Sequence, residues 1–201
     1  MSDQAVAVSG RTMRLREATR AAHERLDNAI MAYDPFSNRQ AYIGFLVMQF
    51  HLHQAAEPYF RNPELAALLP DLVQRSRLER VRLDLADLGE TAPCDVPVSL
   101  PESDATEDVA RGLGWLYVVE GSNLGAAFLL KAAAKLGLSE AFGARHLAGD
   151  PKGRGLHWRQ FTAALDAVDL NECEESIMFA GARDAFFFAG RLAEGIFSAR
   201  S

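Results

Sequence analysis

A histidine followed one helical turn later by a carboxylate occurs in the segment LREATRAAHERLD, residues 15–27. His23 and Asp27 are four residues apart, so on a helix both side chains lie on one face. A carboxylate that accepts a hydrogen bond from Nδ1 leaves Nε2 free for a metal and slightly raises the basicity of the ring. Arg16 precedes His23 by seven residues, which is two turns or roughly 10 Å along the same face. That spacing suits an anionic group attached to whatever His23 binds, although a lone histidine on such a face is more often a packed or partly exposed residue.

Two glycines four residues apart lie in the apparently helical stretch EGSNLGAA, residues 120–127. Each glycine in a helix interior costs about 1 kcal/mol relative to alanine. Gly121 and Gly125 share a helical face with Tyr117 and Phe128. The pattern predicts either close packing against another helix or a flat ligand that lies directly on the backbone, which only glycine permits. The glycine spacing alone does not decide between these two interpretations.

The composition is that of an ordinary soluble globular domain, with 49% apolar and 24% charged residues. The net charge of −6 and the lack of long Lys/Arg runs make nucleic acid an unexpected partner. The N-terminal residues contain no continuous apolar run, and Cys94 and Cys173 have no CxxC neighbour, so we expect a cytoplasmic location. The most apolar segment, 112–138, contains Glu120 and Lys131, and we interpret it as a buried helix with no membrane partner.

Apolar residues recur at steps of three and four along most of the chain, and no alternating strand pattern is longer than four residues. We therefore predict an all-α fold with one helical domain over residues 13–201 and a disordered or extended N-terminus over 1–12. Ser37 and Asp71 are expected helix caps. The helices are expected over residues 15–33, 38–60, 65–69, 71–88, 106–137, 139–147, 156–168 and 172–198, with a Pro-rich loop over 90–103.

The two segments with the histidine and the glycines together resemble the heme oxygenase family. The opening motif of that family has the form L-[KR]-E-A-T-x-x-x-H, and here LREATRAAH ends at His23. The distal helix of its bacterial members is similar to YVVEGSNLGAA, residues 117–127, and the likeness continues through FGARHLAG, 142–149, to the C-terminal helix. The resemblance implies a single-domain, multi-helix fold in which heme lies between the first helix and a Gly-containing distal helix.

The resemblance also implies an activity. Heme b (iron protoporphyrin IX) would be both cofactor and substrate, and the enzyme would degrade it with O2 and electrons to biliverdin, CO and free iron. His23 would be the proximal ligand of the iron, and Gly121 and Gly125 would give heme and dioxygen room on the opposite face. The electron donor would be a ferredoxin or a flavoprotein reductase, with ascorbate as a substitute in vitro.

Further roles are carried over from the family position by position. Ser122 and Asn123 stand near the place where the mammalian enzymes have an aspartate, and Asn123 is expected to hold distal waters. Phe186 in the last helix is expected against the heme edge, and Phe128, on the glycine face, is expected to contact heme as well. The remaining positions are Gln49, His53 and Trp158 for the distal waters, and Arg16 and Tyr117, with Arg183 as a third group, for the heme propionates.

The propionate contacts predict which meso carbon is cleaved. Most members of the family cleave at the α carbon and hold the propionates with a lysine on the first helix and a tyrosine on the distal helix. A pseudomonad relative that cleaves elsewhere lacks both groups and carries an alternative lysine where this chain has Met31. Because this chain keeps a cation at Arg16 and a hydroxyl at Tyr117, we expect biliverdin IXα.

Other functions on a similar fold make different demands on the sequence. A thiamine-degrading relative needs a catalytic cysteine, and neither Cys94 nor Cys173 is placed for that role. A di-iron bundle needs Glu-x-x-His motifs, which the sequence lacks. A non-catalytic heme carrier or sensor stays open, because heme binding and catalysis would share His23.

Overall fold

The computed structural model describes residues 10–93 and 105–198. Within these ranges the chain is helical, and its only β-type pairing is a pair of isolated bridges from Ser139 to Phe142 and Gly143. The elements in chain order are α1 (Arg11–Ala32), α2 (Arg39–Phe60), α3 (Pro63–Leu68), α4 (Leu72–Arg75), α5 (Leu78–Asp87), α6 (Ala105–Ala134), the 3₁₀ helix η1 (Arg145–Leu147), α7 (Arg154–Ala167) and α8 (Glu172–Ser198). The all-α prediction is therefore confirmed.

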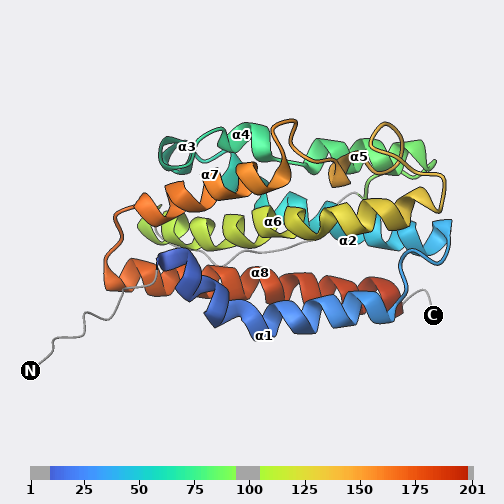
Figure 1. Cartoon of the computed structure of the whole chain (residues 1–201). Coiled ribbons are helices and arrows are strands. Elements are labelled where there is room, and N and C mark those ends of the chain that lie inside the picture. The colour runs from blue at the N-terminus through green and yellow to red at the C-terminus, as the bar shows by residue number, and fades with distance from the viewer. Residues whose placement is uncertain (1–9, 94–104, 199–201) are drawn as a thin grey trace, which may run out of the picture.

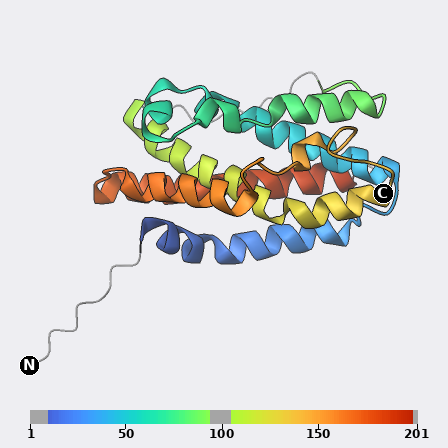
Figure 2. The same cartoon turned by 45° about the horizontal axis from the view of Figure 1, so that its top comes forward.

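Helix α6 is the central element of the fold. It packs along α8 and also contacts α2 and α7, while α1 packs against α8 and α7. Figures 1 and 2 show α3, α4 and α5 gathered on one side of the molecule, away from α1. Both views also show that α1 and α6 run in the same direction along the molecule.

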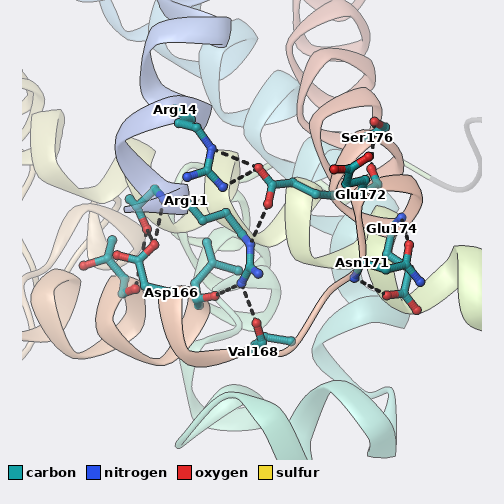
Figure 3. A network of polar contacts seen from close by, with 12 residues as sticks. Arg11, Arg14, Asp166, Val168, Asn171, Glu172, Glu174 and Ser176 are labelled. Atoms are coloured by element: carbon teal, nitrogen blue, oxygen red, sulfur yellow. Dashed lines mark hydrogen bonds and ion pairs between the residues drawn. The ribbon is translucent and has the colours of Figure 1, made fainter. Parts of the chain in front are cut away.

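The start of α1 is fixed to the junction between α7 and α8 by polar contacts (Figure 3). Arg11 Nη1 donates to the carbonyl oxygens of Leu165, at 2.9 Å, and Val168, at 2.6 Å. Arg14 Nη2 lies 2.5 Å from a carboxylate oxygen of Glu175 on α8. These contacts set the position of the helix that carries His23.

The apolar character of α6 follows from its central position. The stretch Asp108–Ala134 is long and apolar enough to cross a membrane by length and composition alone, with a mean hydropathy of 1.3. Half of its most apolar 18-residue window is buried inside the fold, where the helix joins a core with residues of α1, α7 and α8. A core helix of a globular protein has the same composition, and this position accounts for it without a membrane.

A close backbone contact joins α6 to α8 at Gly114 and Gly181. A Cβ atom at Gly114 would overlap with the carbonyl oxygen of Met178, and one at Gly181 would overlap with the carbonyl oxygen of Arg111. Close helix packing therefore occurs at this pair, while the position of a Cβ on Gly125 has no neighbour within 4 Å. Of the two interpretations of the distal glycines, packing does not apply to Gly125.

Two expected helices are wrong in part. Residues 139–147 do not form a helix, because Gly143 has a φ of +73° and is held by a hydrogen bond from the Tyr42 hydroxyl to its carbonyl oxygen at 2.8 Å. The only helical turn in this range is the 3₁₀ helix η1 at its end. The expected continuous helix over 71–88 is interrupted between α4 and α5, where Ser76 has a ψ of 136°. The interruption lets Arg75 and Arg77 both point into the protein, where each is at most 5% exposed.

Smaller differences concern helix starts. Asp71 has a φ of 57° and caps nothing with its side chain, and Asn38, one residue after the expected Ser37, caps α2 by accepting a hydrogen bond from the Ala41 amide at 2.9 Å. Helix α1 begins at Arg11, two residues before the expected domain boundary. Residues 1–9 lie outside the described ranges, so the expectation of an extended N-terminus there stays a prediction.

The contact between α6 and α8 makes Gly114 sensitive to a single methyl group. We expect Gly114→Ala to lower the free energy of unfolding by about 1–3 kcal/mol, because the helices must separate or strain to accommodate it. Gly195→Ala on α8 is the matched control: its Cβ would have no neighbour within 4 Å, so the variant should gain about 0.5–1 kcal/mol from helix propensity. Urea denaturation of the heme-free protein measures both, and equal stability of the two variants would contradict the close contact.

Candidate functional site

His23 lies on the exposed face of α1 with its ring oriented by two neighbours. Its Nδ1 is 3.2 Å from Asp27 Oδ2, as the spacing predicted, and both side chains are more than half exposed. Phe186 of α8 meets the ring edge to face, with the ring centroids 5.8 Å apart and an angle of 70° between the ring planes. With Nδ1 turned to Asp27, Nε2 is the ring nitrogen available to a ligand.

The glycine face of α6 is bare backbone beside exposed apolar side chains. At Gly121 the nearest neighbour of a Cβ would be the Trp158 ring at 3.5 Å, and at Gly125 there is none within 4 Å. Leu124 is 43% and Phe128 77% exposed on the same part of the helix. Exposed apolar residues beside open backbone are typical of a surface that binds a flat apolar ligand.

Helices α1 and α6 meet at a polar contact between Thr19 and Tyr117. Burial raises the pKa of the Tyr117 hydroxyl, and the nearby charge of Arg16 and a hydrogen bond with Thr19 lower it. From this contact both helices run in the same direction (Figure 1), so His23 follows Thr19 by one turn and Gly121 follows Tyr117 by one turn. The structure thus brings Arg16 close to Tyr117, and His23 on α1 and Gly121 on α6 each follow this contact by one helical turn.

Three of the residues expected near the distal waters, Trp158, Ser122 and Asn123, differ in whether their polar groups are already engaged. Trp158 packs on Tyr117, with ring centroids 5.5 Å apart, and lies against Gly121. Ser122 donates its hydroxyl to the carbonyl oxygen of Val119 at 2.7 Å, so that hydroxyl is already engaged within the helix. Asn123 is half-buried, and its Nδ2 has no hydrogen-bond partner among the described residues.

No hydrogen bond, ion pair or ring contact within the described residues joins His53, Gln49 or Arg183 to this group. His53 is only 3% exposed, and burial, with the charges of His146 and Arg77, lowers its pKa to about 3. Gln49 is half-buried on α2, and Arg183 is exposed on α8. Their roles in heme binding therefore stay predictions.

The structure also shows a buried ion pair that sequence reasoning did not include. Arg75 Nη1 donates to Glu120 Oε2 at 2.8 Å, and both side chains are at most 2% exposed. The same Arg75 nitrogen is 3.3 Å from His157 Nδ1, and the guanidinium lies over the Phe161 ring. Burial raises the pKa of Glu120, and the charge of Arg75 opposes that shift. A glutamate inside the most apolar helix of the chain was the signal in the sequence that pointed to such a partner.

The donor set fits an iron porphyrin. The described residues contain no group of three or more His, Cys, Asp or Glu side chains that could hold a metal ion by themselves. A porphyrin brings its own four nitrogen ligands and needs only an axial one, which His23 can supply. An all-helical fold with one exposed histidine beside bare helix backbone therefore suits a protein that binds a porphyrin.

Comparison with known proteins identifies the family. Residues 10–194 match the family described as Heme oxygenase. The chain is 44% identical over 188 residues to heme oxygenase PigA of Pseudomonas aeruginosa, covering 94% of this chain and 93% of that protein. The chain therefore belongs to the heme oxygenase family, and it is a heme oxygenase.

Solved structures agree with this assignment. The heme oxygenase of Neisseria meningitidis, solved with NO and with CO bound, superposes with a TM-score of 0.87 at 39% identity, over 95% of this chain and 94% of that one. The heme complex of heme oxygenase-1 from the cyanobacterium Synechocystis sp. PCC6803 superposes with a TM-score of 0.70 at 15% identity, over 95% of this chain and 96% of that one. The second likeness shows the shared fold alone.

The buried, neutral state of His53 predicts how stability depends on pH. Its pKa of about 3 in the folded protein lies below the ordinary 6.5, so between these values the unfolded chain binds a proton that the folded chain does not. Stability should fall as the pH decreases through this window, by up to about 1.4 kcal/mol per pH unit for this residue. In urea denaturation of the heme-free protein, His53→Phe should have a shallower pH dependence than wild type by about that amount. Equal slopes for wild type and the variant would mean that His53 binds a proton as readily in the folded protein as in the unfolded chain.

Proposed function

We propose that this heme oxygenase binds heme between α1 and α6, with His23 as the iron ligand, and opens the ring to biliverdin IXα, CO and free iron. One observation carries the proposal. Tyr117 of α6 lies beside Thr19 and Arg16 of α1; one turn after Thr19 stands His23, beside Asp27, and one turn after Tyr117 stands the bare backbone of Gly121. A flat ligand with one axial site fits between such groups.

In this proposal each residue has a role set by its own chemistry. Asp27 orients His23 and favours Nε2 as the ligand atom. Gly121 and Gly125 leave space for the ring and for dioxygen, and Leu124 and Phe128 supply apolar contact. The bound heme supplies the iron chemistry that activates dioxygen for attack on its own ring. Trp158 and Asn123 keep the distal side narrow and hold the waters that carry protons.

We assign the propionates to Arg16 and Tyr117. An ion pair at a partly exposed edge contributes about 1 kcal/mol, and a charge-assisted hydrogen bond somewhat more. A combined preference of roughly 2 kcal/mol favours one rotation of the ring about thirtyfold over another. This seating is the basis for α cleavage in the proposal.

We place the reaction in the cytoplasm, with a ferredoxin or a flavoprotein reductase as the electron donor. The decisive experiment is incubation of the purified protein with hemin and ascorbate under air. Loss of the Soret band together with growth of a biliverdin spectrum is the expected result. A Soret band that persists with electrons and dioxygen supplied would favour a heme carrier instead.

The iron ligand is tested by His23→Ala. The variant should lose the low-spin heme spectrum and turnover, because the axial nitrogen is gone, and added imidazole should restore both in part. His51→Ala is the control: His51 is 6% exposed within α2 and should leave the heme spectrum unchanged. A wild-type spectrum of His23→Ala without imidazole would overturn the ligand assignment.

The seating is tested by the isomer of the product. Chromatography against biliverdin standards should give mainly IXα for wild type, and Tyr117→Phe should raise the fraction of other isomers because one propionate contact is lost. Tyr33→Phe is a matched control, since Tyr33 stacks on Phe197 at the other end of α1. A dominant β or δ product from wild type would refute the Arg16–Tyr117 seating while leaving the heme oxygenase activity intact.

A further inference from the structure

A small cavity lies beside the distal helix, on the side of the buried ion pair. Its lining includes Glu120 and Asn123 from α6 and His157 and Trp158 from α7. The space open to the centre of a water molecule is about 10 Å³. That volume is close to the minimum that one buried water requires.

Two buried polar atoms of the residues around this cavity have no hydrogen-bond partner in the described part of the protein. They are Oε1 of Glu120 and Nδ2 of Asn123. A buried polar group left unpaired costs roughly 1–3 kcal/mol, so both call for a partner. Because one atom is an acceptor and the other a donor, a single water in this cavity could satisfy both, accepting from Nδ2 and donating to Oε1.

The surroundings hold both side chains in place. Arg75 Nη1 occupies the other carboxylate oxygen of Glu120, at 2.8 Å, so Oε1 is the oxygen left for the cavity. Arg154 Nη1 donates to the carbonyl oxygen of Asn123 at 3.1 Å and fixes the backbone at that position. His157 lies between the ion pair and the surface, with Nδ1 3.9 Å from Glu120 Oε2 and Nε2 3.9 Å from Asp150 Oδ2.

We propose that Glu120 is a positioning residue of the distal side, which acts through one water bound between its Oε1 and Nδ2 of Asn123. As the partner of Arg75, the carboxylate only accepts hydrogen bonds. The hydrogen bonds through the water therefore have one direction: Asn123 donates to the water, and the water donates to Glu120. With Nδ2 engaged in this way, Oδ1 of Asn123 is the acceptor that remains for the distal waters. Glu120 thereby fixes the orientation in which those waters receive and pass protons.

This inference rests on the proposed function, because it gives the Asn123 amide its place beside the heme. Its first test is made without heme. In the heme-free full-length protein, the Asn123 side-chain amide protons should show a rotating-frame Overhauser contact to a long-lived water in NMR spectra. The paired variant Arg75→Met/Glu120→Leu, which removes both charges together, should lose that contact while keeping its helical circular dichroism. Absence of the contact in wild type would overturn the proposal whatever the variants do.

The second test uses the ferric heme complex. Glu120→Gln keeps the shape of the side chain but adds a hydrogen-bond donor. The direction of the hydrogen bonds through the water is then no longer fixed. Turnover with ascorbate should fall about tenfold, less than the roughly 100-fold that loss of a direct acid–base group costs, and the solvent deuterium isotope effect should rise. Asn123→Ala should lower turnover as well, and the double variant should be no slower than the slower single variant, since both changes disable one water.

A matched control separates this effect from general loss of charge. Glu175→Gln removes a carboxylate that binds Arg11 and Arg14 at the N-terminal end of α1. Glu175 does not line the cavity, so this variant should leave the isotope effect unchanged. Wild-type turnover and isotope effect in Glu120→Gln would overturn the proposed role of Glu120. Failure of the wild-type protein to form a Soret complex would instead defeat the proposed function.

Discussion

The separation between α1 and α6 depends on how both helices are held by α8. Gly114 and Gly181 let the α6 and α8 backbones approach so closely that a methyl group at either position would overlap with a carbonyl oxygen of the other helix. Helix α1 also packs against α8, where Phe186 meets the ring of His23. One helix therefore positions the histidine and the distal backbone together, and the space between them is a property of the packed core.

A second constraint comes from charge buried behind the distal helix. Arg75 and Glu120 are both at most 2% exposed, and an ion pair so far from water stabilises a fold only when its geometry and remaining hydrogen bonds are good. Here the pair has His157 beside it and the Phe161 ring beneath the guanidinium. It also joins α4 to α6, and the interruption between α4 and α5 is what allows Arg75 to reach inward. The distal helix is thus held by polar contacts on one face and left bare on the other.

Much of the architecture could be predicted from periodicity, because a buried helix must repeat its apolar residues every three or four positions. The long helices α1, α2, α6 and α8 follow that rule and were expected close to their observed bounds. Residues 139–147 satisfied the same local pattern and still do not form a helix. There the Tyr42 hydroxyl and the Asp87 carboxylate, both distant in sequence, bind the backbone of Gly143 in a left-handed turn.

The sequence by itself determined the family and the local geometry on single helices, such as the pairing of His23 with Asp27, because these depend on residue identity and helical spacing alone. Only the tertiary structure decided which glycines serve packing: Gly114 and Gly121 look alike in sequence, but one faces the α8 backbone and the other a tryptophan ring at van der Waals distance. It also decided that Glu120 is paired with Arg75, a residue 45 positions away. Contacts between elements far apart in the chain follow from how the helices pack, and no local pattern encodes them.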